Sequence, residues 1–385
     1  MLNFDFYNPT RILFGEGQIA RLRELVPAGA RVLMLYGGGS IRANGVYDEV
    51  KAALSGHTLF EFGGVEPNPT YETLSRAIEL VKAEGIDFLL AVGGGSVIDG
   101  TKFVAAGAKL DEDAWSILEK RAANVQGALP FGAVLTLPAT GSEMNAGAVV
   151  TRKATQEKFA FGSRHVYPQF SILDPVKTYT LPPRQVGNGI IDAFVHVMEQ
   201  YLTYPAGAKV QDRFAEGLLQ TLVEEGPKAL AAPHDYQVRA NLMWTATLAL
   251  NGLIGAGVPQ DWATHMIGHE LTALYGLDHA QTLAVVLPAM MRVRREAKRG
   301  KLLQYAERVW HITEGSEDQR IDAAIERTEA FFREVGVGTR LPDYGLSRDA
   351  IPAVLKALEA HRMAKLGETR EVTLEVSKKV LELTL

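Results

Sequence analysis

The sequence predicts an α/β domain with a parallel sheet over residues 1–180, followed by an all-helical domain over residues 181–385. Short apolar runs typical of buried strands alternate with amphipathic helical segments in the first half. Beyond the sequence Leu-Pro-Pro at 181–183, almost no β-type run occurs. The length of 385 residues also favours two domains, since domains commonly contain roughly 100–200 residues.

Strand and helix patterns follow one another regularly through the first half. The expected strands are short apolar runs, and they span residues 31–36, 58–62, 88–92 and 131–137. The expected helices span residues 48–54, 70–84 and 97–108. The clearest of them has apolar Leu74, Ile78 and Val81 at a spacing of three to four residues. Because strands alternate with helices, we expect a parallel sheet that is covered on both faces.

Helical periodicity dominates the second half. The double proline at 182–183 is a plausible boundary, because proline stops one element and is accepted in the first turn of the next helix. The clearest helical patterns after it span residues 212–230, 239–253, 321–335 and 351–359.

Composition excludes several classes of protein. Hydrophobic residues make up 47% of the chain, which allows a sizeable core, and the formal net charge is only −5. This mild acidity gives no reason to expect a nucleic acid or an anionic membrane as partner. The absence of cysteine excludes disulfides and thiolate metal ligands. Neither a signal-peptide pattern nor an apolar stretch of about 18 residues is present, so we expect a soluble cytoplasmic protein.

Two strand-to-helix turns carry the same sequence, Gly-Gly-Gly-Ser, at 37–40 and 93–96. Glycine lets the backbone approach a ligand closely, and the following helix offers free N–H groups to a phosphate. The carboxyl ends of parallel strands are where α/β folds bind a pyrophosphate. We therefore expect a dinucleotide site, which the polar segment 138–145 could also line. The turns lack the G-x-G-x-x-G fingerprint, and the alternative is that their glycines only form tight turns.

Apolar helical segments carry an aspartate and several histidines. Asp192 and His196 are four residues apart, as are His265 and His269, so each pair shares a helix face. His279 follows shortly after. One carboxylate and several imidazoles suit Zn²⁺ or Fe²⁺. The spacing leaves open whether His265 or His269 is a ligand, and any single histidine here could instead be an ordinary core residue.

Several motifs extend this interpretation, and they are distributed from near residue 3 to the C-terminus. They are NPTRILFG at 8–15, GGGS at 93–96 with Asp99, LPATGSE at 137–143, DAFVH at 192–196 and GLDH at 276–279. In these motifs the chain resembles the iron-containing (group III) alcohol dehydrogenases, and most closely their NADPH-dependent aldehyde reductase and butanol dehydrogenase branch. The resemblance implies a Rossmann-like dinucleotide-binding domain, a helical metal-binding domain, an active site in the cleft between them and a homodimer.

The resemblance also implies roles for individual residues. The metal ligands would be Asp192, His196, His265 and His279, with His269 beside the substrate. Asp192, His269 and His279 are thereby the expected catalytic residues. The implied cofactor contacts are Gly38, Ser40, Asn68, Gly94, Gly95, Ser96, Asp99, Thr136, Thr140, Asn145, Lys158 and Tyr179. Sequence alone would favour a solvated surface charge for Lys158.

The turn after Tyr36 bears on the choice between NAD and NADP. NAD-preferring members of the family place an acid near the adenosine ribose, whereas this chain has the glycine-rich turn 37–40 at that point. No carboxylate there would repel a 2′-phosphate, and Ser40 could donate a hydrogen bond to it. We therefore expect NADP(H).

The expected reaction is hydride transfer from the nicotinamide C4 to an aldehyde carbonyl polarised by the metal, with a proton supplied by way of His269. The alternatives are a glycerol dehydrogenase or dehydroquinate synthase reaction on the same architecture, or a non-catalytic nucleotide sensor with a structural metal. A synthase would require several Lys and Arg residues around the metal. The segments that flank Asp192 and His265 are apolar, which favours small or medium-chain aldehydes and their alcohols as substrates.

Overall fold

The computed structural model describes residues 1–385, which form two compact units. We call Tyr7–Leu181 together with His234–Met243 the sheet unit. We call the rest the helical unit, which comprises Met1–Phe6, Pro182–Pro233 and Trp244–Leu385. The main change of unit thus falls within the Leu-Pro-Pro sequence. A single boundary at 180/181 would assign residues 1–6 to the first domain and residues 234–243 to the second. In the structure, residues 1–6 belong to the helical unit and residues 234–243 to the sheet unit.

The sheet unit contains a six-stranded sheet of order β1-β8-β5-β4-β2-β3, in which every neighbouring pair is parallel. The strands are β1 (Arg11–Phe14), β2 (Arg31–Tyr36), β3 (Thr58–Phe62), β4 (Phe88–Gly94), β5 (Phe131–Leu137) and β8 (Phe170–Leu173). The expected parallel sheet is therefore confirmed. The bounds of β2, β3 and β5 are those that the sequence predicts, while β1 and β8 were not expected from the apolar runs.

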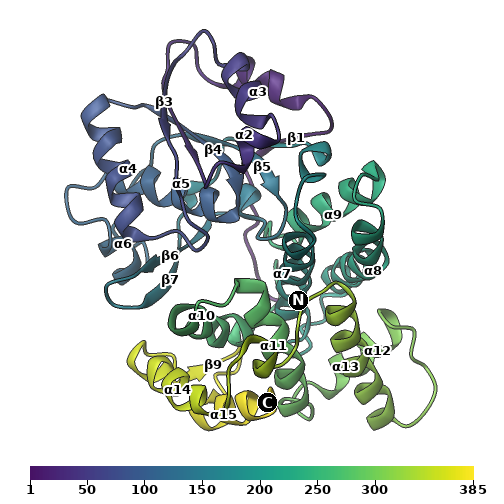
Figure 1. Cartoon of the computed structure of the whole chain (residues 1–385). Coiled ribbons are helices and arrows are strands. Elements are labelled where there is room, and N and C mark those ends of the chain that lie inside the picture. Colours follow the sequence, from purple (N-terminus) through teal and green to yellow (C-terminus); the bar gives the residue numbers. More distant parts are fainter. The chain divides into compact units, whose positions relative to one another are not determined.

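Helices cover both faces of this sheet, as the alternation of buried side chains requires (Figure 1). Leu33 and Leu35 of β2 belong to one core with residues of α4, α5 and α6. Val32 and Met34 of the same strand point to the other face and pack with residues of α1, α2 and α3. The helices are α1 (Leu22–Leu25), α2 (Ser40–Ala43), α3 (Val46–Ala53), α4 (Tyr71–Glu84), α5 (Gly95–Gly107) and α6 (Ser116–Glu119).

An antiparallel hairpin, which the sequence analysis did not foresee, follows β5. It consists of β6 (Gly147–Arg152) and β7 (Glu157–Gly162), joined by a polar turn. Val150 and Phe161 pack into the same core as α5. Apolar residues are consecutive in both strands, at 148–150 and 159–161, so the hairpin lacks the simple alternation that marks a half-buried strand. Short 3₁₀ turns complete the unit at Gln18–Arg21, Ser142–Met144, Arg164–Val166 and Pro175–Thr178.

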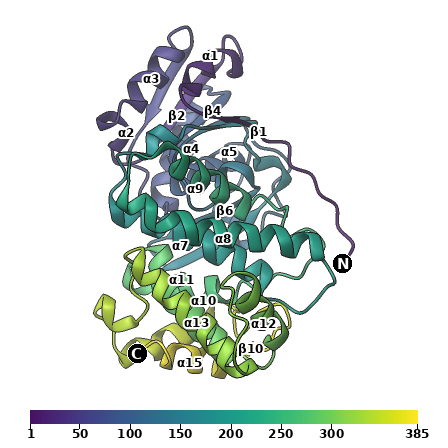
Figure 2. The same ribbon diagram turned by 90° about the vertical axis from the view of Figure 1, so that its right-hand side faces the viewer.

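The helical unit is built around α7, which packs against α8 and α11, while α11 packs against α10, α13 and α15 (Figure 2). The bounds are α7 (Pro183–Tyr201), α8 (Lys209–Ala231), α10 (Ala263–Tyr275), α11 (His279–Val293), α12 (Arg299–Arg308), α13 (Glu317–Glu334), α14 (Ile351–Ala360) and α15 (Leu374–Glu382), with 3₁₀ turns at Leu341–Tyr344 and Arg348–Ala350. Helix α9 (Tyr236–Ala249) begins in the sheet unit and ends in this one.

The second half is helical as predicted, with one exception. Two strands of two residues each, β9 (Lys365–Leu366) and β10 (Val372–Thr373), form a small antiparallel ladder. Such a short ladder is set by the turn between its strands, so it leaves no hydrophobic period in the sequence. No helix in the structure combines the length and the apolar character needed to cross a bilayer.

Candidate functional site

Helix α7 presents Asp192, His196 and Glu199 on one face, because residues at i, i+4 and i+7 align along a helix. The helix begins at Pro183, in the first turn, where a proline costs no hydrogen bond. Nearly every residue from Val186 to Tyr201 is buried. Polar groups on such a helix need partners inside the protein or a bound ion.

The other two ligand candidates come from the starts of two neighbouring helices. His265 lies in the first turn of α10, and His279 is the first residue of α11. Asp278, which precedes α11, accepts hydrogen bonds from Arg184 Nη2 at 2.6 Å and Asn188 Nδ2 at 2.8 Å, both on α7. These bonds tie the start of α11 to α7 and so fix the position of His279.

The structure brings Asp192, His196, His265 and His279 together. One ligand atom from each lies within 4.8 Å of the corresponding atoms of the other three. The Asp192 Oδ1 atom is 3.5 Å from the Nε2 atoms of both His196 and His279. Two ligands of a tetrahedral zinc ion are about 3.4 Å apart when each is about 2.1 Å from the metal. The donor set and its spacing therefore fit one divalent cation.

Burial favours the neutral, metal-binding form of one imidazole in this group. Burial lowers the pKa of His196 to about 4, with Asp192 acting in the opposite direction and His265 lowering it further. His196 is therefore neutral near pH 7, and a neutral imidazole is the form that binds metals. Asp192, His196 and His265 are at most 5% exposed. The His279 side chain is 23% exposed, so the group is open on that side, as a catalytic metal requires.

His269 lies beside this group without belonging to it. Its ring centroid is 5.4 Å from that of His279 and 6.3 Å from that of His265. The spacing of His265 and His269 in the sequence could not decide which of them joins Asp192 and His196. The structure places His265 in the group and His269 next to it.

Sequence reasoning missed Glu199, whose carboxylate contacts the imidazole Nδ1 of His265. Burial raises the pKa of Glu199 to about 8, and Asp261 raises it further, while hydrogen bonds from the backbone of Thr264 and His265 and the charge of Lys298 oppose this. The signal that could have found Glu199 is its position three residues after His196, on the same apolar helix face.

In the sheet unit, the three polar turns lie at the same edge of the sheet. Residues 37–40 and 138–145 follow β2 and β5, and residues 93–96 span the end of β4 and the start of α5. These strands are adjacent in the order β5-β4-β2. Gly39 adopts a φ of 107°, a left-handed conformation that favours glycine. At Gly95, the first residue of α5, a Cβ atom would lie 2.3 Å from Oγ1 of Thr140. Glycine therefore permits the turns after β4 and β5 to meet.

Hydrogen bonds join several of the expected cofactor contacts. The Asn68 backbone N–H donates to Oγ of Ser96 at 3.2 Å. The Nζ of Lys158 donates to Oδ1 of Asn68 at 2.8 Å. Lys158 lies on β7 and is only 6% exposed, so the interpretation as a solvated surface charge is wrong. Its burial depends on how the hairpin packs in the sheet unit, which local sequence does not reveal. Asp99 accepts from the Ser142 hydroxyl at 2.5 Å.

Lys102 is a second residue that sequence reasoning missed. It is fully buried on α5, and its Nζ donates to Asn145 Oδ1 at 2.9 Å and to the Gly147 carbonyl at 2.7 Å. Burial lowers the pKa of Lys102 to about 8, while Asp99 and then Glu143 act in the opposite direction. Burial likewise raises the pKa of Asp99, which Lys102 opposes. A lysine in the apolar segment 97–108 is the signal that could have revealed it.

The remaining expected contacts lie in the same unit. Gly38 and Ser40 are exposed at the turn after β2, and Thr136 is buried near the end of β5. Tyr179 lies outside the strands and stacks on the ring of His234 at 5.3 Å. The structure thus gathers most of the twelve residues at one sheet edge, while Tyr179 is placed by a separate contact.

The sheet unit carries a cluster of turns of the kind that bind nucleotides. The helical unit carries an Asp-His group suited to a divalent cation. These two features define a class of metal-dependent dehydrogenases. Residues 9–175 match the family described as iron-containing alcohol dehydrogenase, and residues 187–382 match the C-terminal part of the same family. The chain belongs to the iron-containing alcohol dehydrogenase family. It is an oxidoreductase, as predicted, and the family description agrees with the expected divalent metal.

Individual relatives resemble the chain over nearly its whole length. The NADPH-dependent aldehyde reductase YqhD of Escherichia coli K12 is 63% identical over 99% of both chains. A probable NADH-dependent butanol dehydrogenase 1 of Bacillus subtilis is 45% identical over 92% of both. The crystal structure of E. coli YqhD has a TM-score of 0.99 and 62% identity, and covers 100% of this chain and 99% of that one. A butanol dehydrogenase A structure from Thermotoga maritima has a TM-score of 0.95 and 37% identity, with coverage of 100% and 99%.

Proposed function

We propose that this chain is an NADPH-dependent aldehyde reductase that converts small and medium-chain aldehydes to primary alcohols. The balanced reaction is RCHO + NADPH + H⁺ → RCH₂OH + NADP⁺, and it is reversible. The family membership and the 63% identity to an E. coli enzyme named for this activity support the proposal. The observation that carries it is the four-residue group of one carboxylate and three imidazoles.

We infer that Asp192, His196, His265 and His279 hold one divalent ion, zinc or iron. When bound, such an ion supplies Lewis-acid polarisation of the substrate carbonyl. The four side chains contribute a single negative charge, because the imidazoles bind in their neutral form. The site therefore keeps a net positive charge, which favours a developing alkoxide. His269 would pass a proton from one imidazole nitrogen to the product oxygen.

The glycine-rich edge of the sheet unit would hold the nucleotide, which supplies the hydride. Gly95 and Ser96 begin α5 after the N-cap Gly94, and free backbone N–H groups there can donate hydrogen bonds to a pyrophosphate. Lys158 would add a positive charge, held in place by Asn68. Asp99 and Asn145 fix the turn after β5.

A cluster of charges next to the turn at 37–40 supports NADPH over NADH. Arg42 and Lys51 both contact Glu61, at 3.3 and 3.2 Å, on the strand next to β2. The turn itself carries no acid, and the nearby Glu61 is engaged by these two cations and by Tyr47. The cluster has one more positive than negative charge, which favours a 2′-phosphate near Ser40.

The test of this proposal is to compare kcat/KM with NADPH and with NADH, using butanal as substrate and following absorbance at 340 nm. We expect NADPH to be preferred and activity to be lost after metal removal. A preference for NADH would contradict the cofactor assignment. Tight NADPH binding without turnover of any aldehyde in a panel would instead favour a nucleotide sensor.

We also propose that the protein is a homodimer and that it is cytoplasmic. Large apolar side chains are exposed along the N-terminal segment, at Met1, Leu2, Phe4, Phe6 and Tyr7. An exposed apolar patch of this kind is typical of an interaction surface. Sedimentation equilibrium of the purified chain would test the dimer, and a concentration-independent monomer mass would contradict it.

A further inference from the structure

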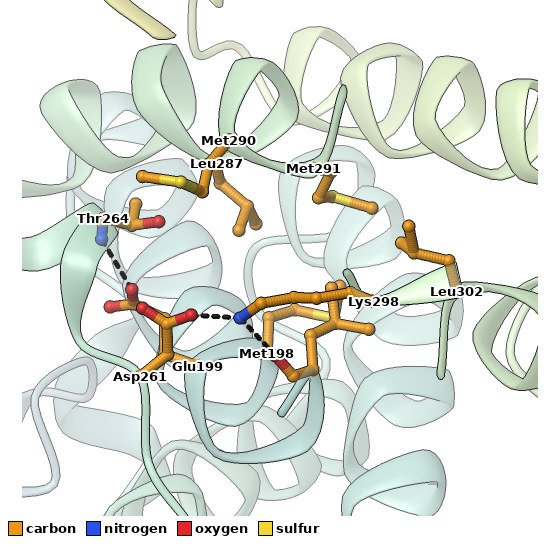
Figure 3. Close-up of a pocket in the computed structure, with 10 residues that line it drawn as sticks. Met198, Glu199, Asp261, Thr264, Leu287, Met290, Met291, Lys298 and Leu302 are labelled. Carbon is orange, nitrogen blue, oxygen red and sulfur yellow. Dashed lines mark hydrogen bonds and ion pairs between the residues drawn. The ribbon is translucent and has the colours of Figure 1, made fainter. Parts of the chain in front are cut away.

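A buried ionic cluster, drawn in Figure 3, lines a small cavity. It contacts His265, a member of the group Asp192, His196, His265 and His279, which we call the metal group. Its charged members are Glu199, Asp261 and Lys298, which are between 3% and 8% exposed. They line a cavity of about 20 Å³, which has room for roughly one water molecule. The rest of the cavity wall is mostly apolar and is formed by Met198, Leu202, Leu287, Met290, Met291 and Leu302.

The carboxylate of Glu199 acts as a hydrogen-bond acceptor at both oxygens. Oε1 accepts from the backbone N–H of Thr264 at 2.6 Å, and Oε2 accepts from that of His265 at 3.2 Å. Oε2 also contacts Nδ1 of the His265 ring. A cation bound at Nε2 would require the ring proton of His265 to be on Nδ1, so that Nδ1 would donate to Glu199 in this contact.

We propose that Glu199 is a positioning residue for the metal centre, which holds His265 in the tautomer and ring orientation that bind the cation. A histidine that binds a metal through one nitrogen generally donates the other N–H to a carboxylate or carbonyl group, which fixes the ring and raises its basicity. Helix α7 would then supply two ligands, Asp192 and His196, and the group that orients a third. This inference rests on the metal role proposed above.

The surrounding contacts hold Glu199 in this place. Its backbone carbonyl accepts from the Asp261 N–H at 2.9 Å, and the Asp261 carboxylate accepts from the Ala263 N–H at 2.9 Å. Lys298 contacts Asp261 and donates to the Leu202 carbonyl at 2.6 Å. Lys298 thereby joins the segment of Asp261 to that of Leu202, and its positive charge lies beside the buried Asp261 carboxylate.

The hydrogen bonds of Glu199 and Asp261 converge next to the turn before α10, which contains a residue in an unfavourable backbone conformation. Trp262 adopts a left-handed φ of 63°, which is unfavourable for a bulky residue and persists only where the surrounding structure fixes it. Glu199 and Asp261 bind the first N–H groups of α10 on the C-terminal side of this residue. Glu199 therefore fixes both the backbone that carries His265 and the ring of His265.

The same helix provides a matched control. Glu270 of α10 is 3% exposed and lies 2.7 Å, through Oε1, from Nδ1 of His361. This is also a buried carboxylate–histidine pair, but His361 does not belong to the metal group. Replacing Glu270 by Gln removes the charge from a pair of the same chemical kind without affecting a proposed ligand.

The experiment measures metal affinity directly, by competing Zn²⁺ and Co²⁺ against a chromophoric chelator in the metal-stripped full-length chain. We expect Glu199→Gln to weaken Zn²⁺ binding by about 10–100-fold, because an amide NH₂ cannot accept from the His265 donors. Glu270→Gln should retain the wild-type affinity. The absorption bands of bound Co²⁺ should change in Glu199→Gln alone, since they report ligand geometry.

A folded Glu199→Gln variant with wild-type metal affinity and an unchanged Co²⁺ spectrum would overturn the inference. If that variant does not fold, Glu199→Asp provides the test, because it retracts the carboxylate by one methylene. Its affinity should fall between those of the wild type and a variant that lacks His265, and unchanged affinity would again overturn the inference. If the wild type itself binds no metal, the proposed function fails as well, so the two failures are distinguishable.

Discussion

His265 and His269 lie one turn apart on α10 and are almost equally buried, at 5% and 4% exposure. Their chemistry differs because their neighbours differ. His265 faces Glu199 at one ring nitrogen and stacks on His196, with ring centroids 4.8 Å apart. His269 lies on the side of His279. At the residue scale, the direction of each side chain relative to neighbouring helices therefore determines which histidine joins Asp192, His196 and His279.

Replacing either His265 or His279 by Ala should abolish aldehyde reduction and lower metal content together, because the cation would lose one of four ligands. Metal content by elemental analysis and activity with NADPH would be measured on the same preparations. His311→Asn is a suitable control, since His311 is exposed and has a φ of 56° that asparagine tolerates. Full activity of the His279→Ala variant would contradict the metal role.

Lys102→Met should change stability in a pH-dependent way. Burial lowers the pKa of Lys102 to about 8 from its usual 10.5, against the charges of Asp99 and Glu143. Between these two pH values the unfolded chain binds a proton that the folded chain does not, so raising the pH favours folding of the wild type. The Tm of the wild type should therefore rise relative to that of Lys102→Met between pH 8 and 10. A constant difference would contradict a depressed pKa.

At the scale of elements, helix starts and strand ends build both candidate sites. The polar turns follow β2, β4 and β5, because adjacent parallel strands end at one edge of the sheet. His265 and His279 lie at the starts of α10 and α11, which are packed against each other. Close contacts between such elements depend on glycine, as at Gly95.

Gly95→Ala should weaken NADPH binding by roughly tenfold, which corresponds to about 1.4 kcal/mol. The new Cβ atom would overlap Thr140, whose Oγ1 would lie 2.3 Å away, and would push apart the turns after β4 and β5. Fluorescence titration with NADPH would measure the effect. Gly127→Ala is the control, because a Cβ there would meet no atom within 4 Å. Equal affinity in the two variants would argue against a nucleotide site at Gly95.

Gly217→Ala should stabilise the protein. Gly217 is exposed within α8, and a Cβ there would meet no atom within 4 Å. Alanine in a helix interior is favoured over glycine by up to about 1 kcal/mol. Calorimetry should show an increase in Tm of about 2 °C for the helical unit, whereas a decrease would indicate that this surface is covered by a partner chain.

At the scale of the whole molecule, the expected nucleotide and the expected metal ion are assigned to different units. The expected cofactor contacts lie within Tyr7–Leu181, and the metal group lies within the helical unit. A ligand that binds only the folded state stabilises the unit that holds it. The two ligands should therefore protect different parts of the chain.

Hydrogen exchange followed by mass spectrometry should reveal this division. Adding Zn²⁺ to the stripped chain should slow exchange in α7, α10 and the start of α11, whereas NADPH should slow exchange in the turns at 37–40, 93–96 and 138–145. Stabilisation should reach about 2.7 kcal/mol when the free ligand is at 100 times its Kd. Protection of the sheet unit by Zn²⁺ alone would contradict the assignment of the metal to the helical group.

Local sequence determined much of this protein. Apolar runs specified β2, β3 and β5 to the residue, and the Asp and His spacing identified the residue types of the metal group, because both signals arise within one strand or one helix. The tertiary structure alone decided the strand order with β1 and β8, the burial of Lys158 on the hairpin strand β7, the place of His265 in the group, and the contact between Glu199 and His265. These features depend on which distant segments pack together. The hydrophobic periodicity of a single helix or strand does not contain that information.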